Sequence, residues 1–188
     1  MMKYYILFGP PGAGKGTQAT AMAEKYNLCH ISTGELLRAE IKAGTELGKQ
    51  AAALINDGKL VPDRVVEAMI ASKFTSVKNV DGFLLDGFPR TLDQAEALDE
   101  MLEEDGETVT AVVSIMIPDE MIIRRIQGRA LVEGRADDAD IDVIRHRIET
   151  YHAQTEPLIA YYKAQDKYRQ VDGTGTIEQV REDIFKIL

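Results

Sequence analysis

The N-terminal segment joins an apolar run to a glycine-rich loop and then to a stretch with helical spacing. The apolar run covers residues 4–8, the loop is Gly-Pro-Pro-Gly-Ala-Gly at 9–14, and a helix is predicted at Lys15–Tyr26. Because glycine has no Cβ, the backbone N–H groups of such a loop can turn toward an anion. The N-terminus of the following helix adds a partial positive charge at the same place. The segment therefore predicts a strand, a phosphate-binding loop and a helix in sequence.

Two side chains at the start of that helix suit a bound triphosphate. Lys15 would place a positive charge on the outer phosphates, and Thr17 would place a hydroxyl beside a bound magnesium ion. The hydroxyl stands two positions after the lysine, one later than in the general pattern. A glycine-rich turn without a ligand is the alternative, but the strand before it and the helix after it argue against that alternative. We therefore expect a P-loop that binds a nucleoside triphosphate.

Short apolar runs alternate with helical segments along the chain. Strands are predicted at residues 4–8, 82–85 and 109–117, with shorter runs at 30–31 and 168–171. Helices are predicted at 15–26, 34–43, 46–55, 64–74, 92–104, 119–128, 141–163 and 177–188. This alternation is typical of an α/β fold with a parallel sheet covered on both faces. Ligands of such sheets bind at the carboxyl ends of the strands, where the glycine-rich loop lies.

Two segments interrupt the alternation. Residues 32–62 contain helices with no strand between them, which predicts a small helical insertion. Residues 128–140 show neither a helical nor a strand period, and we expect a surface loop there that is long enough to act as a lid.

Length and charge limit the class of protein. A chain of 188 residues is expected to form one domain with small insertions. The formal net charge of −9 argues against a nucleic-acid partner. No apolar run is long enough to cross a bilayer and no signal peptide is evident, so we expect a cytoplasmic protein without a membrane partner. The single cysteine, Cys29, cannot build a structural zinc site. We also expect a monomer.

An acidic residue and an arginine follow the apolar run at 82–85. Asp86 would end a central strand beside the phosphate loop, where a carboxylate can hold magnesium directly or through water. A turn or helix cap is the alternative for this Asp-Gly pair. Arg90 follows in Gly-Phe-Pro-Arg, and its planar guanidinium group suits a phosphate in the same cleft.

Four more arginines flank the predicted lid: Arg125, Arg129, Arg135 and Arg147. Arg125 and Arg129 stand four positions apart, so they share one face of the predicted helix. A solvated charge is the ordinary state of a surface arginine, and we leave Arg124 and Arg145 in that class. In an acidic chain, four arginines around one loop beside a triphosphate site indicate a phosphate clamp that closes with the loop.

Taken together, these motifs resemble those of the adenylate kinase family over essentially the whole chain. They are, in the family's order, GPPGAGKGTQ at 9–18, HISTGELLR at 30–38, GKLVPD at 58–63, DGFPRT at 86–91, GRADD at 134–138 and PLIAYY at 157–162. The threonine two positions after the lysine is this family's own form of the P-loop. Relatives with a long lid often carry four zinc-binding cysteines, and this chain has neither that length nor those thiols.

The resemblance implies the reaction ATP + AMP ⇌ 2 ADP with Mg²⁺, in a three-layer P-loop fold. It assigns ATP binding to Gly12, Ala13, Gly14, Lys15, Gly16, Thr17, Arg125, Arg129 and Gly175. It assigns AMP binding to Thr33, Arg38, Lys59, Leu60, Val61, Gly87, Phe88, Pro89, Arg90, Gln94, Arg135 and Arg147. Catalysis would depend on Lys15, Arg90, Arg125, Arg129, Arg135 and Arg147, with Thr17 and Asp86 near magnesium.

The resemblance also implies a division of the chain and several local features. The AMP-binding insertion would cover 32–61, the lid 128–138, and the core 1–31, 62–127 and 139–188. Asp137 and Asp138 in the lid would pair with arginines when it closes. Phe88-Pro89 would have a cis peptide bond. Arg129 would be exposed until closure, so that its loss would alter turnover and leave stability nearly unchanged.

Two other functions compete with this interpretation. A pyrimidine nucleoside monophosphate kinase has the same fold, but Thr33, Thr91 and Gln94 look like the adenine-binding version. A nucleotide sensor without turnover would be expected to lack Lys15 or some of the clamp arginines, and all are present. Turnover of ATP with different nucleoside monophosphates would separate the three.

Overall fold

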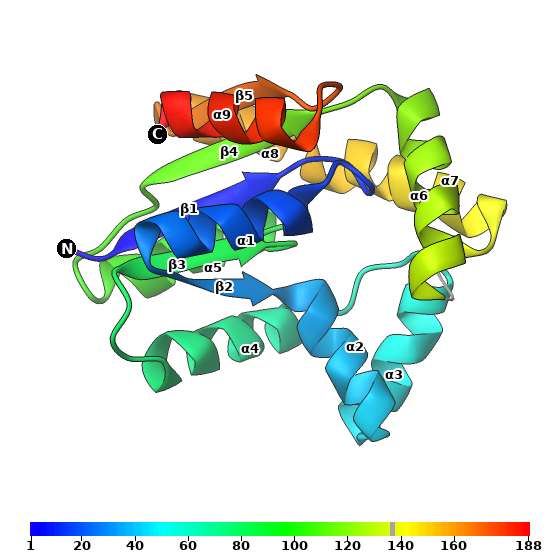
Figure 1. Ribbon diagram of the computed structural model, residues 1–188. Coiled ribbons are helices and arrows are strands. Elements are labelled where there is room, and N and C mark those ends of the chain that lie inside the picture. Colours follow the sequence, from blue (N-terminus) through cyan, green and yellow to red (C-terminus); the bar gives the residue numbers. More distant parts are fainter. Residues whose placement is uncertain (136–137) are drawn as a thin grey trace.

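The computed structural model describes residues 1–135 and 138–188. A parallel sheet in the strand order β2-β3-β1-β4-β5 forms its centre (Figure 1). The strands are β1 Lys3–Phe8, β2 Leu28–Ser32, β3 Gly82–Asp86, β4 Ala111–Met116 and β5 Tyr168–Asp172. Both short runs, at 30–31 and 168–171, are therefore strands, and the predicted α/β fold with a parallel sheet is confirmed.

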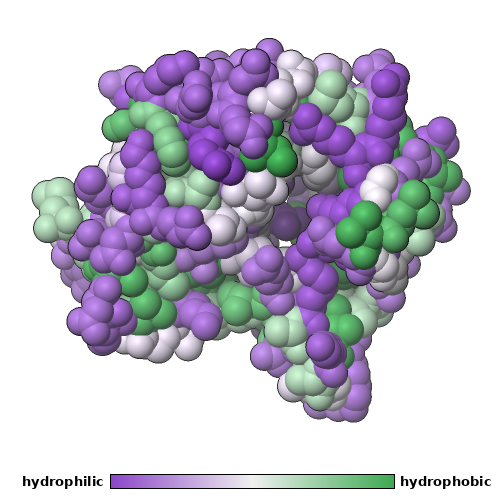
Figure 2. All heavy atoms as spheres, viewed as in Figure 1, coloured by the Kyte–Doolittle hydropathy of each residue, from purple (hydrophilic) through white to green (hydrophobic). Residues whose placement is uncertain are grey.

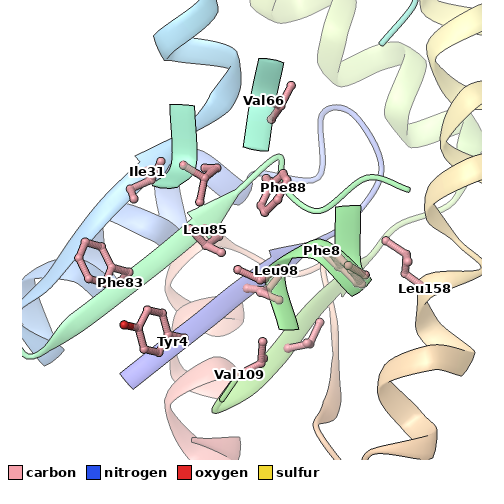
Figure 3. Close-up of a cluster of buried hydrophobic side chains, with 14 of the residues drawn as sticks. Tyr4, Phe8, Ile31, Val66, Phe83, Leu85, Phe88, Leu98, Val109 and Leu158 are labelled. Atoms are coloured by element: carbon pink, nitrogen blue, oxygen red, sulfur yellow. The ribbon is translucent and has the colours of Figure 1, made fainter. Parts of the chain in front are cut away.

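The alternation of side chains on β1 explains why helices cover both faces of the sheet. Tyr4, Ile6 and Phe8 point into one apolar cluster, and Tyr5 and Leu7 point into a second one on the opposite face. The first cluster is covered by α4 Asp63–Ser76, α5 Leu92–Glu103 and α8 Leu158–Ala164, and Figure 3 shows part of it. The second is covered mainly by α1 Lys15–Tyr26 and α9 Ile177–Ile187.

The strand register brings the predicted functional segments to one edge of the sheet. Asp86 at the end of β3 is paired in register with Leu7 of β1 and with Ser32 of β2. Because the three strands are parallel, the loops that follow Phe8, Ser32 and Asp86 leave the sheet side by side. The P-loop, the start of the helical insertion and the Asp86–Arg90 segment thus meet there.

The insertion consists of two helices, α2 Thr33–Ala43 and α3 Glu46–Asn56, which project from the sheet (Figure 1). Gly44 ends α2 with a positive φ of 67°, a conformation that favours glycine, and Thr45 caps α3 by accepting a hydrogen bond from the Gly48 N–H. Gly48 also lets α3 touch the Glu40 carbonyl of α2, where a Cβ would clash. The prediction of helices without a strand in this segment is confirmed.

The segment expected to form a loop from residue 128 begins instead as a helix. Helix α6 runs over Asp119–Glu133, so its last six residues lie in the predicted lid loop. Gly128 does not break the helix, and the helix ends at Gly134, whose φ of 61° and N–H bond to the Ala130 carbonyl close its C-terminus. The prediction of a loop over 128–133 was wrong because a single glycine inside a helix costs only about 1 kcal/mol.

The single helix expected at 141–163 is divided. Helix α7 Ile141–Thr150 leads into a π-helical turn, Tyr151–Thr155, and α8 begins after Pro157. Proline has no N–H and cannot continue the helical hydrogen bonding, and the Glu156 N–H bonds to the Tyr151 carbonyl five residues earlier. Among the described residues, no helix has the length and apolar character needed to span a bilayer.

Candidate active site

A cleft opens at the carboxyl ends of β1, β2 and β3, between the insertion and the segment from α7 to the π-helical turn. In Figure 2 the surface is hollowed at the centre of the face shown, and hydrophilic side chains lie around the hollow. Many residues predicted from the sequence line the cleft: Lys15, Thr33, Arg38, Lys59, Leu60, Val61, Gly87, Pro89, Arg90, Gln94 and Arg147. The fold thus gathers most of the predicted monophosphate site and the P-loop lysine around one cavity.

The P-loop has the backbone geometry that its glycines predict. Gly14 is the N-cap of α1 with a φ of 88°, and Gly9 has a φ of 150° where a Cβ would lie 2.7 Å from the Ile115 carbonyl oxygen. The Lys15 ammonium group bonds to the carbonyls of Gly9 at 3.0 Å and Pro10 at 3.2 Å. Loss of hydration on burial lowers the pKa of Lys15 to about 8, although Asp86 nearby acts in the opposite direction.

Asp86, at the end of β3, lies near His30 and feels the charges of Lys15 and Arg90. The His30 Nε2 atom lies 3.5 Å from Asp86 Oδ2. Burial acts to raise the pKa of the Asp86 carboxyl, but His30, Lys15 and Arg90 outweigh it and hold that pKa below its usual value. Asp86 is therefore ionised at neutral pH, as a ligand of a cation or of its bound water must be.

The Gly87 carbonyl joins two of the predicted monophosphate residues. It accepts a hydrogen bond from Thr33 Oγ1 at 2.9 Å and another from Arg90 Nε at 2.8 Å. Gly87 has a φ of 83°, and a Cβ there would lie 2.7 Å from Thr33 Oγ1 and 2.9 Å from Arg90 Nη2. Glycine is thus required both by the backbone and by the close approach of these side chains. The following Phe88-Pro89 bond is cis, as expected.

Gln94 lies at the base of the cleft with its side-chain amide held on both sides. Its Oε1 accepts from the Arg90 backbone N–H at 2.7 Å, and its Nε2 donates to Asp63 Oδ1 at 2.7 Å. Thr91, the N-cap of α5, accepts from the Gln94 N–H and donates to Asp63 Oδ2. Only 2% of Gln94 is exposed, so the amide has little freedom to turn.

Arg125 connects the P-loop to the loop that follows β5. Its Nη2 donates to the Gly173 carbonyl at 2.8 Å, and its Nη1 lies 3.5 Å from the Ala13 carbonyl. Helix α6 also packs closely on the P-loop. A Cβ at Gly12 would lie only 3.0 Å from Ile126 Cγ1 of that helix. Gly175 lies two residues beyond Gly173, next to the capping box of α9 formed by Thr176 and Gln179.

Arg129 and Arg147 meet on the carboxylate of Asp138. Arg129 donates from Nε to Oδ2 at 2.6 Å and from Nη2 to Oδ1 at 2.8 Å, while Arg147 Nη1 donates to Oδ1 at 2.8 Å. The Asp138 side chain is fully buried. Burial acts to raise its pKa, but the two guanidinium groups hold it below the usual value. Arg129 is therefore paired with a lid aspartate in this structure, and its exposure before closure stays a prediction.

Several predicted residues lie away from the cleft wall. Arg135 is paired with Glu133 at 2.6 Å and does not line the cavity. The Phe88 side chain is fully buried in the apolar cluster with Val66 and Leu85 (Figure 3), which leaves only its backbone for a ligand. Thr17 and Gly16 lie exposed at the start of α1. Asp137 lies outside the described residues.

The structure adds residues that the sequence analysis missed. Thr155, in the π-helical turn, donates from Oγ1 to the Arg90 carbonyl at 2.8 Å. Gly58, where the insertion returns to the sheet, leaves room for α7, since a Cβ there would lie 3.1 Å from Arg147 Cγ. Asp63 follows Val-Pro in the motif at 58–63, which could have drawn attention to it. No sequence signal marks Thr155, because its partner lies 65 positions away.

A magnesium ion held mainly by substrate fits these donors. Asp86 offers an ionised carboxylate and Thr17 a hydroxyl, and magnesium bound to nucleotide phosphates commonly takes one or two protein oxygens with water in the remaining positions. Among the residues that the structure describes, no group of three or more His, Cys, Asp or Glu side chains forms an all-protein metal site.

Comparison with known proteins agrees with this geometry. The sequence model of the family described as adenylate kinase matches residues 7–167. The chain belongs to the adenylate kinase family. The adenylate kinase of Flavobacterium johnsoniae is 49% identical over 97% of this chain and 96% of the relative. Those of Bacteroides fragilis and Leptospira biflexa are 47% and 46% identical, over 96% and 98% of this chain and 95% and 99% of the relatives.

Membership of the adenylate kinase family makes the chain a phosphotransferase. The five-stranded parallel sheet with flanking helices is consistent with the P-loop fold of adenylate kinases.

Proposed function

We propose that this chain transfers the terminal phosphoryl group of ATP to AMP, giving two ADP, and so balances the adenine nucleotides. The observation that carries the proposal is the shared cleft, in which Lys15 of the P-loop faces the same cavity as Arg90, Arg147 and the predicted monophosphate residues. The γ-phosphoryl group of an ATP bound at the P-loop would therefore lie next to the phosphate of an AMP bound by Arg90 and Arg147.

In the proposed reaction, an oxygen of the AMP phosphate attacks the γ-phosphorus of ATP, and the bond from that phosphorus to the β,γ-bridging oxygen breaks. The protein contributes mainly position and charge, because the transferred group carries its negative charge on three equatorial oxygens. Lys15 and the P-loop amides hold the ATP phosphates. Arg90 and Arg147 orient the AMP phosphate from the opposite side.

The four clamp arginines have different partners. Arg125 stays attached to Gly173 and supports the ATP side, while Arg129 and Arg147 share Asp138. We propose that these guanidinium groups, with Arg135 after a movement of the lid, surround the phosphoryl group in flight and stabilise it more than the ground state. Magnesium near Thr17 and Asp86 would neutralise phosphate charge.

The monophosphate site is proposed to take adenine. Gln94 carries a donor and an acceptor on one amide, as adenine does on its edge. Thr33, Arg38 and the segment 59–61 lie around the same cavity and would hold the rest of the nucleotide. Residues 32–61 and 128–138 are proposed to move as the insertion and the lid of the enzyme.

The proposal also covers the setting of the reaction. We propose a monomer in the cytoplasm that binds ATP, AMP and ADP. We propose that neither nucleic acid nor a membrane is a partner, and the net charge of −9 argues against nucleic acid. The molar mass from light scattering on the purified protein tests the monomeric state.

The decisive experiment is a turnover assay with ATP and Mg²⁺ and each of AMP, GMP, CMP and UMP. AMP should give the highest kcat/KM. A preference for CMP or UMP would make the chain a pyrimidine nucleotide kinase, and binding without turnover would make it a sensor. Lys15→Met serves as the inactive control.

A further inference from the structure

Asp63 links helix α4 to Gln94, the predicted base-binding residue on α5. It is the first residue of α4, and it is half-buried. Its carboxylate accepts a hydrogen bond from Gln94 Nε2 at 2.7 Å and another from Thr91 Oγ1 at 3.1 Å.

The partners of Gln94 determine which way its amide points. The Arg90 backbone N–H can only donate, so it must face Gln94 Oε1, and the Asp63 carboxylate can only accept, so it must face Nε2. Turning the amide by 180° would place two donors together at Arg90 and two acceptors together at Asp63. Both hydrogen bonds would then be lost in a buried site.

The fixed amide has one N–H and one oxygen lone pair left for a ligand. On its Watson–Crick edge, adenine offers an acceptor at N1 and a donor at the 6-amino group, which complement that remaining pair. A 6-oxopurine offers the reverse, a donor at N1 and an acceptor at O6, which only the turned amide could match. The orientation of the Gln94 amide thus separates 6-aminopurines from 6-oxopurines.

We propose that Asp63 is a specificity-determining positioning residue, which locks the Gln94 amide in the orientation that accepts a 6-aminopurine monophosphate and rejects a 6-oxopurine monophosphate. Asp63 acts through Gln94 and does not touch the base. The inference rests on the proposed function, because it takes the cleft beside Gln94 to be the AMP site.

The test compares AMP with inosine monophosphate (IMP), which carries a 6-oxo group. Asp63→Leu keeps the branched outline of aspartate but has no acceptor, whereas Asp63→Asn keeps an acceptor oxygen. Asp63→Leu should lower the AMP:IMP ratio of kcat/KM about tenfold or more, through a higher KM for AMP and a lower KM for IMP. The kcat with saturating AMP and the KM for ATP should stay within about twofold. Asp63→Asn should retain most of the wild-type ratio.

Two control variants separate the role of Asp63 from the loss of a charge and from the role of Gln94. Asp93→Leu removes an exposed acid from the first turn of α5, so it controls for lost charge at a helix N-terminus. Gln94→Ala tests the base-binding role itself. If Gln94→Ala lowers the AMP:IMP ratio and Asp63→Leu does not, the Asp63 inference is overturned and the AMP site stands. If Gln94→Ala leaves the ratio unchanged, the proposed base site is overturned, and the inference with it.

A purely structural role would have a different signature. Equal losses of kcat with AMP and IMP, with an unchanged ratio, would overturn the inference even if the melting temperature falls. If Asp63→Leu does not fold, Asp63→Ala takes its place with the same expected change in ratio.

Discussion

Asp138 holds Arg129 in a two-point ion pair, with 2.6 Å between Nε and Oδ2 and 2.8 Å between Nη2 and Oδ1. The same carboxylate binds Arg147, so one buried acid sets the distance between guanidinium groups from α6 and α7. Arginines placed in this way need little rearrangement when charge develops on a transferred phosphoryl group. The pairing also ties the stability of this region to the clamp.

Replacing Arg129 should therefore affect both turnover and folding. We expect Arg129→Ala to lower kcat on the order of 100-fold or more, because it removes a charged donor to the transferred group. Because Asp138 would lose two hydrogen bonds in a buried position, the free energy of unfolding should fall by about 1–3 kcal/mol. Steady-state kinetics and thermal unfolding measure the two effects. Arg124→Ala, an exposed arginine of the same helix, should change neither. A normal kcat for Arg129→Ala would remove Arg129 from the clamp.

The pKa of about 8 for Lys15 predicts that nucleotide binding takes up protons. At pH 8.5 the ligand-free lysine is mostly neutral, and triphosphate oxygens favour its charged form, so binding should raise the pKa and draw up to one proton from solution. Affinity for ATP should weaken as the pH rises through 8. Calorimetry in buffers of different ionisation enthalpy measures the uptake, and Lys15→Met should abolish it. Proton release by the wild type would contradict this assignment.

The same shift has a consequence for the ligand-free protein. The folded-state pKa of Lys15 lies below the ordinary 10.5, so between these values the unfolded chain binds more protons. The contribution of this group is thus a penalty to stability that is fully present below pH 8 and disappears as the pH approaches 10.5.

Gln94 should affect one nucleotide more than the other. We expect Gln94→Ala to raise the KM for AMP about tenfold or more, because a matched donor and acceptor are lost, and to leave the KM for ATP within about twofold. Glu96→Ala, an exposed change on the same helix, is the matched control. An equal or greater rise in the KM for ATP would show that the two nucleotide pockets have been assigned the wrong way round.

The lid should need no structural metal. The chain has one cysteine, at position 29, and the described part of the lid region is held by the Arg129–Asp138–Arg147 contacts and by the Arg135–Glu133 pair. A zinc-selective chelator in excess Mg²⁺ should leave melting temperature and activity unchanged. A clear fall in melting temperature would reveal a zinc site.

Much of the fold follows from local sequence. The apolar runs at 4–8 and 82–85 predict strands, because a buried strand reads as a short apolar run. The glycine-rich loop predicts a P-loop, because glycine readily adopts the positive φ that such a loop requires. The C-terminal end of α6 and the division at 141–163 were predicted less well. Gly128 has the same local signature whether a helix continues or stops, and the effect of Pro157 extends several residues back to Tyr151.

The site was predicted as a set of residues but not as a network. Motifs pointed to Arg90, Gln94 and Arg147 because phosphate and base binding restrict residue types. Their partners, Asp63 and Thr155, are ordinary polar residues whose roles depend on contacts 31 and 65 positions apart. Such contacts arise only when the chain is folded, and no single-sequence period encodes them.

Gly58 determines how closely the two walls of the cleft can approach. Its backbone lies against Val143 and Arg147 of α7, and any Cβ would come within 3.1 Å of both. A larger residue would act as a spacer that keeps the insertion away from the arginine it must face. In the proposed reaction, Gly58 therefore helps to set how near the insertion lies to Arg147, one of the guanidinium groups of the clamp.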